Sequence, residues 1–282
     1  MTNDARRTVV PALRPSSSSS IPMILILGGT AAYFLPLEEL LGPLRRVDLE
    51  TPHGVAFPIF LLQRYGERVA FASRHGLGQL EVSPPFVNAR ANIWAAHALG
   101  VTRILSWNGV GAINPLLEVH DLLVLDGVLD FTKTRIHSFT DDRTGTIYHS
   151  PAVDPCFDPA LSSTLYEAAA RYDEQRTTDD GRRTTGNGRI FRKGIYACSE
   201  GPRLETAAEI RGFRRARADV VGMTLVPEVF LARELGMAFA SLAYVTNYAT
   251  GVEPAHGAPR FFGIEVGRRC LAVVLAAVKA AL

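Results

Sequence analysis

The sequence contains only three cysteines, Cys156, Cys198 and Cys270, and they are far apart. They form no CxxC motif and their number is odd, so neither a secreted disulfide framework nor a structural zinc site is indicated. A reducing cytoplasm is the simplest location for such a chain. The sequence also lacks any run that approaches the roughly 20 uninterrupted apolar residues of a membrane helix. We therefore expect no membrane partner.

The body of the chain has no excess of charge of either sign. The 282 residues include 30 basic and 28 acidic side chains, a formal net charge of +2. The first twenty residues hold three arginines and one aspartate, which leaves 27 basic and 27 acidic residues in the remainder. A protein that binds nucleic acid needs a basic face to neutralise phosphates. The balance therefore predicts that nucleic acid is not a partner.

Residues 1–20 differ in composition from the rest of the chain. They include two prolines and end in five consecutive serines, Ser16 to Ser20, so they contain too little apolar surface to fold. We predict a disordered tail, and it lacks the apolar segment of a signal peptide. The chain as a whole is 47% apolar and 21% charged, as expected of a globular protein. We predict that residues 21–282 form one domain.

Short apolar runs alternate with longer helical segments along this domain, which is typical of an α/β fold. The polar segment 172–188 predicts an exposed loop or insertion. Gly100 is expected to end the first of two clear helices. The predicted strands are 23–27, 68–73, 103–107, 121–126 and 237–246. The predicted helices are 88–99 and about 261–282, and two more are expected to start near Glu205 and Met223.

Two of the predicted strands lead directly into residues suited to an anion. Gly28-Gly29-Thr30 follows the first strand, where exposed main-chain N–H groups could surround an anion. Neither a GxGxxG fingerprint nor a P-loop is present, so alone this is an ordinary tight turn. Arg74 and His75 follow the second strand, and ligands of α/β sheets bind at the carboxyl ends of strands. Taken singly, they would be a surface arginine and a partly buried histidine.

Two further segments repeat the pattern and change its interpretation. Asn108-Gly109 is expected in a glycine-rich turn after the third strand, and Met223-Thr224 before a helix whose N-terminal dipole favours an anion. Four such turns predict a site for a phosphate-sized anion without a cofactor tail. Two other polar residues have simple structural interpretations: Glu205 as a helix N-terminal carboxylate, and Asn247 as a turn former after the last strand.

Taken together, the motifs resemble the trimeric purine nucleoside phosphorylases, and within them the branch that contains methylthioadenosine phosphorylase. The similarity extends from about Met23 to Gly251. It implies an α/β domain with a mixed central sheet surrounded by helices, and reversible phosphorolysis of a nucleoside to a base and a sugar 1-phosphate. The motifs that carry it are GGT, SRHG, VNARANIWA, NGVGAINPLLEVHD, YACSEGPRLETAAEI and VGMTLVPEVFLARELG.

The resemblance also implies roles for individual residues. The phosphate ligands correspond to Thr30, Arg74, His75, Asn108, Gly109 and Thr224, and the methionine that packs on the sugar corresponds to Met223. The positions that recognise the base correspond to Leu204, Glu205 and Asn247, with Tyr248 and Ala249 beside them. His149 corresponds to a residue that closes the 5′ end of the sugar from a neighbouring subunit. Asn247 and His75 are the residues we expect to be catalytic.

Hydrogen-bond chemistry predicts the base. Methylthioadenosine phosphorylases carry aspartates at the positions of Asn247 and Ala249 and a serine at that of Glu205. The amide of Asn247 can donate to O6 and N7 of a 6-oxopurine, while Glu205 can accept from N1–H. We therefore expect phosphorolysis of inosine or guanosine, in which phosphate attacks the anomeric carbon and Asn247 stabilises the charge that develops on the purine.

The resemblance implies no metal or cofactor, because inorganic phosphate is a co-substrate and the nucleophile, and it implies a homotrimer or a dimer of trimers. Departures from the family pattern affect the sugar 5′ pocket: Gln79 stands where a histidine is usual, Ala89 where a tyrosine is usual, and Ala31-Ala32 where Gly-Leu is commoner. The alternative within the class is a phosphorylase of 5′-methylthioinosine or 5′-methylthioadenosine. The sugar 5′ pocket, which includes His149 and His256, would distinguish these substrates from inosine and guanosine. In a different class, the chain would be a catalytically weak oligomeric paralogue that binds purines.

Overall fold

The computed structural model describes residues 9–11, 23–140, 153–174, 188–253 and 263–282. They form one α/β domain with a mixed sheet of thirteen strands and six α-helices. The strands are β1 (Val9–Pro11), β2 (Met23–Gly28), β3 (Leu44–Thr51), β4 (Gly54–Val55), β5 (Ile59–Leu62), β6 (Val69–Ser73), β7 (Val101–Ala112), β8 (Leu122–Val124), β9 (Gly127–Phe131), β10 (Ile190–Phe191), β11 (Ile195–Ser199), β12 (Val220–Gly222) and β13 (Ala238–Tyr248). The α-helices are α1 (Leu37–Leu41), α2 (Ala89–Ala98), α3 (Pro159–Glu174), α4 (Ala207–Arg215), α5 (Leu225–Glu234) and α6 (Ile264–Ala281).

The centre of the sheet is parallel and its flanks are mixed. β2 pairs in parallel with β6 on one side and β7 on the other, and β7 also pairs in parallel with β13. β5 and β3 extend the sheet beyond β6 in antiparallel pairs. β12 runs antiparallel to the last part of β7 and leads through β11 to β9. The parallel centre therefore brings the carboxyl ends of β2, β6 and β13 to one edge of the sheet.

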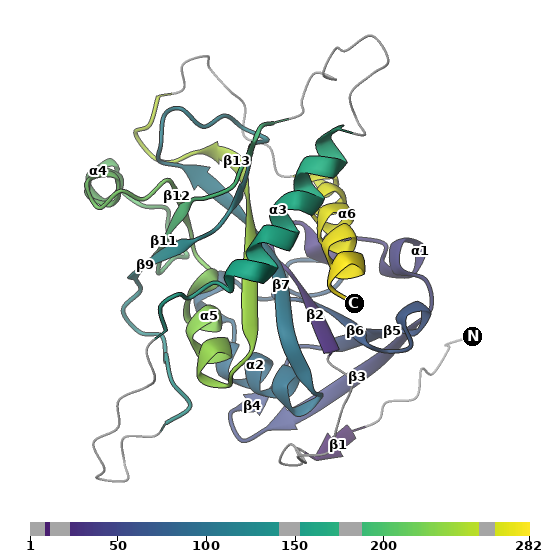
Figure 1. Cartoon of the computed structure of the whole chain (residues 1–282). Helices are drawn as coiled ribbons and strands as arrows, with labels where there is room; N and C mark the ends of the chain where they lie inside the picture. Colours follow the sequence, from purple (N-terminus) through teal and green to yellow (C-terminus); the bar gives the residue numbers. More distant parts are fainter. Residues whose placement is uncertain (1–8, 12–22, 141–152, 175–187, 254–262) are drawn as a thin grey trace.

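Helices cover both faces of this sheet. In Figure 1, α3 and α6 lie side by side on one face, while α2 and α5 pack together on the other. Successive side chains of β2 alternate between the two cores: Ile24 and Ile26 pack under α3 and α6, and Leu25 and Leu27 face the core that includes α2 and α5. A strand buried on both faces needs a continuous apolar run, which explains why it was recognisable in the sequence.

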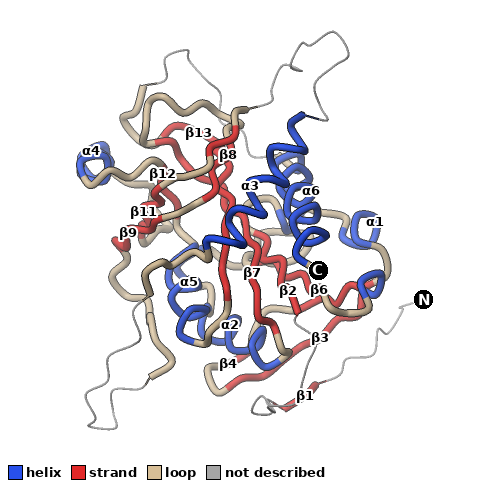
Figure 2. The backbone as a smooth tube through the Cα atoms, in the orientation of Figure 1, coloured by secondary structure: helices blue, strands red, loops and turns tan. Residues whose placement is uncertain are grey.

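Two helix ends follow from local sequence. α2 begins after Asn88, whose side chain accepts a hydrogen bond from the main-chain N–H of Ala91, and Gly100 follows the helix with a φ of +88°. α4 begins after Thr206, which forms a reciprocal capping box with Glu209. Glu205, which was expected to cap this helix, does not do so, and its carboxylate can therefore contact a ligand. Figure 2 shows α4 beside β11 and β12, away from α3 and α6.

The structure corrects two predictions about where strands end. Asn108 and Gly109 do not lie in a turn, because β7 continues to Ala112. The reason is pairing on both sides: the segment 108–112 is held extended by β13 and, at its end, by β12. Likewise, Asn247 lies inside β13 and not after it.

Part of the polar sequence lies outside the described residues. Of the predicted tail, residues 9–11 are described, and they pair in parallel with β3, which the serine- and proline-rich composition did not predict. Of the predicted loop 172–188, the first three residues belong to the end of α3, and residues 175–187 lie outside the described part. All three cysteines are buried free thiols. Among the described residues, no helix combines the length and the apolar character needed to cross a membrane.

Candidate active site

A pocket of about 210 Å³ lies at the edge where the parallel strands end. Arg74 and Asn108, also predicted for the site, lie just behind its wall and are 3% and 1% exposed. His149 lies outside the described residues. The other predicted site residues all line the pocket: Thr30, His75, Gly109, Leu204, Glu205, Met223, Thr224, Asn247, Tyr248 and Ala249.

Thr30 and Gly109 form one wall of the pocket through a close contact between the turn after β2 and strand β7. The main-chain N–H of Gly109 donates to Oγ1 of Thr30 at 3.0 Å. A Cβ atom at position 109 would lie only 2.7 Å from the Cβ of Thr30, so the contact requires glycine. Because Thr30 accepts this bond, its own hydroxyl hydrogen remains available to a ligand.

Arg74 is held behind the pocket by a buried carboxylate. Its Nε lies 2.7 and 2.8 Å from the two oxygens of Glu228, and Nη1 donates to the main-chain oxygens of Trp107 and Leu27. Nη2 is buried and has no hydrogen-bond partner among the described residues. Burial raises the pKa of Glu228, and the Arg74 guanidinium opposes that rise. The guanidinium is thus fixed in place, and its Nη2 group still has hydrogens to donate. A side chain that binds an oxyanion needs such free donors.

His75 is buried beside Arg74 and turns one ring nitrogen towards main chain. Nδ1 lies 2.9 Å from the carbonyl oxygen of Val82. Burial lowers the pKa of His75 to about 4; the bond to Val82 opposes this and the charge of Arg74 adds to it. The imidazole is therefore neutral at pH 7.

Thr224 and Asn108 belong to a buried network that reaches the core of the sheet. The Thr224 hydroxyl donates to Oδ1 of Asn108 at 2.9 Å, and Nδ2 of Asn108 donates to Oγ of Ser241 at 2.7 Å. Ser241 also accepts from Ser106. The network holds the Thr224 side chain in its place in the wall of the pocket.

The predicted anion site at the N-terminal end of a helix is not formed at Thr224. The main-chain N–H of Thr224 points to the phenolic oxygen of Tyr196, 3.3 Å away. Val226, one residue into α5, has non-helical dihedral angles, so the first turn does not align its N–H groups. Side chains of this turn, and not an aligned helix end, therefore face the pocket.

Glu205 lines the same pocket. The residue is 7% exposed, and its carboxylate accepts a hydrogen bond from the Ser199 hydroxyl at the end of β11. That bond uses one acceptor position of Oε1 and leaves the rest of the carboxylate for a ligand.

Asn247 is turned into the pocket by an irregularity of β13. The pairing with β7 shifts register between Val245 and Asn247, the mark of a β-bulge. Oδ1 of Asn247 lies 2.8 Å from the Thr246 hydroxyl, and Nδ2 donates to the carbonyl oxygen of Tyr248. These bonds identify the oxygen and nitrogen of the amide and leave the second Nδ2 hydrogen for a ligand.

Met223 and Leu204 complete the pocket with apolar surface. Gly201 has a φ of +69°, and a Cβ there would come within 2.7 Å of the Met223 sulfur, so this glycine makes room for the methionine. Leu204 is 57% exposed at the pocket rim. Of the residues that depart from the family pattern, Ala89 lines a neighbouring pocket of about 180 Å³ that shares Thr224 with the first one.

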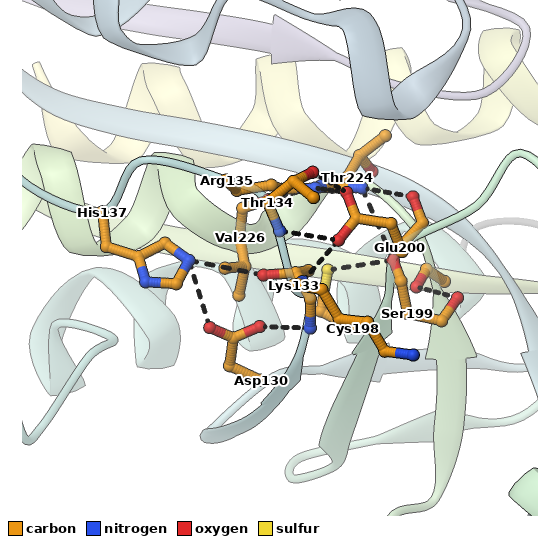
Figure 3. Close-up of polar contacts among 12 residues, drawn as sticks. Asp130, Lys133, Thr134, Arg135, His137, Cys198, Ser199, Glu200, Thr224 and Val226 are labelled. Carbon is orange, nitrogen blue, oxygen red and sulfur yellow. Dashed lines mark hydrogen bonds and ion pairs between the residues drawn. The ribbon is translucent and has the colours of Figure 1, made fainter.

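A cluster of polar contacts links two segments that carry residues of the site, the start of α5 and the end of β11 (Figure 3). Arg135 donates to the main-chain oxygens of Val226 and Glu200, and so joins the start of α5 to the end of β11. The Glu200 carboxylate accepts from the main-chain N–H groups of Lys133 and Thr134, which lowers its pKa against the effect of its burial. The segment after β9 thus ties the Thr224 turn to the strand that carries Ser199.

Several of these supporting residues were not singled out in the sequence, although some carried a signal. Glu228 is a single carboxylate in the apolar run LVPEVFLA, a pattern that indicates a buried and paired charge. Ser241 and Thr246 lie in an apolar strand and carried a weaker signal of the same kind. Nothing local marked Ser199 or Arg135 as partners of the site.

The site combines hydrogen-bond donors suited to an oxyanion with a carboxylate and an amide. Among the described residues, no group of three or more His, Cys, Asp or Glu side chains could hold a metal ion. The charged groups at the site are Arg74, Glu228 and Glu205. This arrangement can hold a small anion and a polar heterocycle in one pocket that the apolar Met223 also lines.

Comparisons with known proteins agree with this geometry. Residues 23–279 match the phosphorylase superfamily. The chain is 39% identical over 238 residues to the 6-oxopurine nucleoside phosphorylase of Pyrococcus furiosus, which covers 82% of each protein. It is 38% identical over 233 residues to a Methanothermobacter thermautotrophicus protein named probable S-methyl-5′-thioinosine phosphorylase, covering 83% of this chain and 74% of that one.

The fold gives the same result. A crystal structure of methylthioadenosine phosphorylase from an antarctic soil metagenomic library superposes with a TM-score of 0.75 and 32% identity, over 92% of this chain and 86% of that one. The family match covers nearly the whole described domain, and the residues of the pocket are those that carried the resemblance in the sequence. The chain belongs to the phosphorylase superfamily.

Proposed function

We propose that this chain is a purine nucleoside phosphorylase selective for 6-oxopurines, which cleaves inosine or guanosine with phosphate to the free base and ribose 1-phosphate. The observation that carries the proposal is the pairing of Glu205 with the Asn247 amide in the pocket that Thr30, His75 and Gly109 also line.

The anion end suits phosphate. Two donor groups are available there, the hydroxyl of Thr30 and Nη2 of Arg74, and the Thr224 hydroxyl joins them if it turns from Asn108. No metal or cofactor is part of the proposal, because phosphate is itself the nucleophile. Asn108 and Gly109 then act mainly by holding Thr224 and Thr30.

The base end suits a 6-oxopurine. The available Nδ2 hydrogen of Asn247 would donate to N7 or O6, and the Glu205 carboxylate would accept from N1–H. A 6-aminopurine presents the opposite pattern at N1 and the 6-position, so it would leave Glu205 facing a lone pair. Sites with polar groups that a wrong substrate leaves unpaired discriminate strongly.

The reaction requires little chemistry from the protein beyond placement. A phosphate oxygen bonds to C1′ of the ribose as the C1′–N9 bond breaks, and that electron pair leaves with the purine. Overall, hydrogen phosphate loses its hydrogen when it becomes the sugar phosphate, and the released base gains one hydrogen. Asn247 stabilises the negative charge on the leaving purine, and one such positioned donor typically contributes about 3 kcal/mol to the barrier.

A second candidate, phosphorolysis of 5′-methylthioinosine, uses the same base and is favoured by the similarity to the Methanothermobacter thermautotrophicus protein. Glu205 and Asn247 do not distinguish the two substrates. The sugar 5′ pocket would, and His149 and His256 lie outside the described residues.

The proposal includes a cytoplasmic homotrimer or dimer of trimers. The three free thiols are compatible with a reducing compartment. Phe86 and Ile136 are 73% and 56% exposed near the Thr224 turn, where a subunit interface would cover them. Light scattering of the purified protein would measure the assembly.

The decisive test is base release from inosine, guanosine, adenosine, 5′-methylthioinosine and 5′-methylthioadenosine, each with and without phosphate. We expect phosphate-dependent release from the 6-oxopurine nucleosides at least about a hundredfold faster than from adenosine. Base release without phosphate would identify a nucleosidase, and binding without turnover would identify a binding protein. Preference for a methylthio nucleoside would favour the second candidate.

A further inference from the structure

We propose that His75 accepts a hydrogen bond from a hydroxyl group of the bound anion, so that the site selects hydrogen phosphate over a tetrahedral anion with no hydroxyl, such as sulfate. This inference rests on the proposed function for the identity of the anion. It concerns which protonated form of the anion the pocket takes, and it assigns to His75 the role of an acceptor.

The tautomer of His75 follows from its contact with Val82. A carbonyl oxygen can only accept, so Nδ1, which lies 2.9 Å from it, carries the hydrogen. In a neutral ring the other nitrogen, Nε2, then has a lone pair and no hydrogen. Because the ring lines the pocket, Nε2 is the ring nitrogen that remains for a ligand.

The surroundings of His75 keep the ring neutral. Arg74 is the nearest cation and disfavours a second positive charge, although Glu228 neutralises it from behind. Glu81 follows in the same loop and contacts His75 through main chain, its N–H donating to the His75 carbonyl oxygen. The ring of Tyr33 lies edge-on with its centroid 6.5 Å away. Burial, aided by the charge of Arg74, outweighs the hydrogen bond to Val82 and lowers the pKa of His75 to about 4.

The anion pocket therefore offers no net positive charge. Arg74 and Glu228 are both almost fully buried and compensate each other, and Nε2 of the neutral His75, a residue that lines the pocket, carries a lone pair. Orthophosphate keeps at least one hydroxyl group throughout the neutral pH range, and this hydroxyl can donate to Nε2. Sulfate has none, so its oxygen would face the Nε2 lone pair, a repulsive contact between two buried acceptors.

Sulfate can gain a hydrogen bond from His75 only if the ring takes up a proton. Above the pKa of the free ring, binding that requires one proton strengthens about tenfold for each unit by which the pH falls. Sulfate itself does not titrate in this range, so such a slope reports the protein. Phosphate needs no proton on His75 and should not show it.

The experiment measures competitive inhibition by sulfate, and the KM for phosphate, from about pH 6 to about pH 8 with saturating inosine. We expect the sulfate inhibition constant to fall about tenfold per pH unit on acidification, while the KM for phosphate changes less than about threefold. Arsenate, which keeps a hydroxyl, should behave as phosphate does. In His75→Gln the amide can rotate to donate, so the sulfate slope should disappear and sulfate should compete better at the alkaline end.

Thr30→Ala is the matched control. It removes a hydroxyl donor that serves both anions, so it should weaken sulfate and phosphate by similar factors and keep the slope. A flat sulfate profile in the wild-type protein would overturn the proposal. A slope that survives in His75→Gln would assign the titration to another group, such as Glu228, and would also overturn it.

A measurement without turnover separates this inference from the proposed function. Stabilisation of the wild-type protein by sulfate and by phosphate can be followed by thermal denaturation over the same pH range. If no nucleoside is cleaved but sulfate stabilises only at the acidic end and phosphate throughout, the proposed function fails and the role of His75 stands. Equal, pH-independent stabilisation by the two anions would refute it. If His75→Gln does not fold, His75→Asn takes its place.

Discussion

The Nε atom of Arg74 lies within 2.8 Å of both carboxylate oxygens of Glu228, and the two side chains are 0% and 1% exposed. The pair comes from the end of β6 and from the interior of α5, 154 positions apart in the chain. It holds the guanidinium behind the pocket wall, and it also cancels the positive charge that Arg74 would otherwise bring to the anion site.

Replacing Glu228 tests how much the ion pair with Arg74 contributes to the free energy of unfolding. In Glu228→Gln the buried guanidinium loses its counter-charge, so we expect the free energy of unfolding to fall by about 3 kcal/mol. Phosphate should then raise the melting temperature of the variant more than that of the wild type, because the anion supplies the missing charge. Glu67→Gln, which breaks the exposed pair with Arg45, should change stability by less than about 1 kcal/mol. Equal phosphate shifts in variant and wild type would argue against a compensated site.

Gly109→Ala tests the close approach of β7 to Thr30. The added methyl group would overlap the Thr30 side chain, so we expect the KM for phosphate to rise at least about tenfold. Gly212→Ala in α4 is the control, because a Cβ there meets no atom within 4 Å and alanine favours the helix. Steady-state kinetics at varied phosphate measure the effect, and an unchanged KM would mean that Thr30 does not contribute to the anion site.

Ser199→Ala should affect the nucleoside and not the phosphate. It removes the hydroxyl that donates to Glu205, and hydrogen bonds to charged groups typically contribute about 2 kcal/mol. We expect the KM for inosine to rise about tenfold while the KM for phosphate stays within about twofold. The control variant Ser163→Ala, at a partly exposed serine on α3, should match the wild type in both constants. A parallel rise of both KM values would indicate a general loss of structure instead.

Asn247→Asp tests the basis of base selectivity. A carboxylate at this position accepts from a 6-amino group and repels O6, so the ratio of kcat/KM for inosine to that for adenosine should fall by at least about tenfold. The neighbouring Thr246 hydroxyl can donate to the new carboxylate as it does to the amide oxygen. Assays of both nucleosides at saturating phosphate give the ratio, and a ratio that stays at the wild-type value would refute the assignment.

His75 should make the protein less stable in mild acid. Its pKa is lowered from 6.5 to about 4 in the folded chain, so the unfolded chain binds more protons between these values. The contribution of His75 is complete above about pH 6.5 and is lost as the pH falls towards 4, to a total of about 3 kcal/mol. Urea denaturation over this range should show a smaller loss for His75→Gln than for the wild type.

Much of the fold and of the site was predictable because the signals are local. Met23 to Leu27 and the region of β13 are apolar runs that any parallel strand buried on both faces requires. Glycine and polar residues after such runs indicated the edge at which Thr30 and His75 line one pocket. The extension of β7 through Gly109 was not predictable, because it depends on pairing with β12 and β13 and not on the glycine-rich sequence itself.

The sequence by itself therefore determined the α/β class, the central strands of the sheet, the family, and most of the residues that meet at the pocket. Only the tertiary structure decided their chemical state: Glu228 cancels the charge of Arg74, Val82 sets the tautomer of His75, and Ser199 orients Glu205. The reason is physical. Backbone preference and hydrophobic pattern act over a few residues and can be recognised along the chain, whereas charge compensation and hydrogen-bond direction depend on neighbours that only folding brings together.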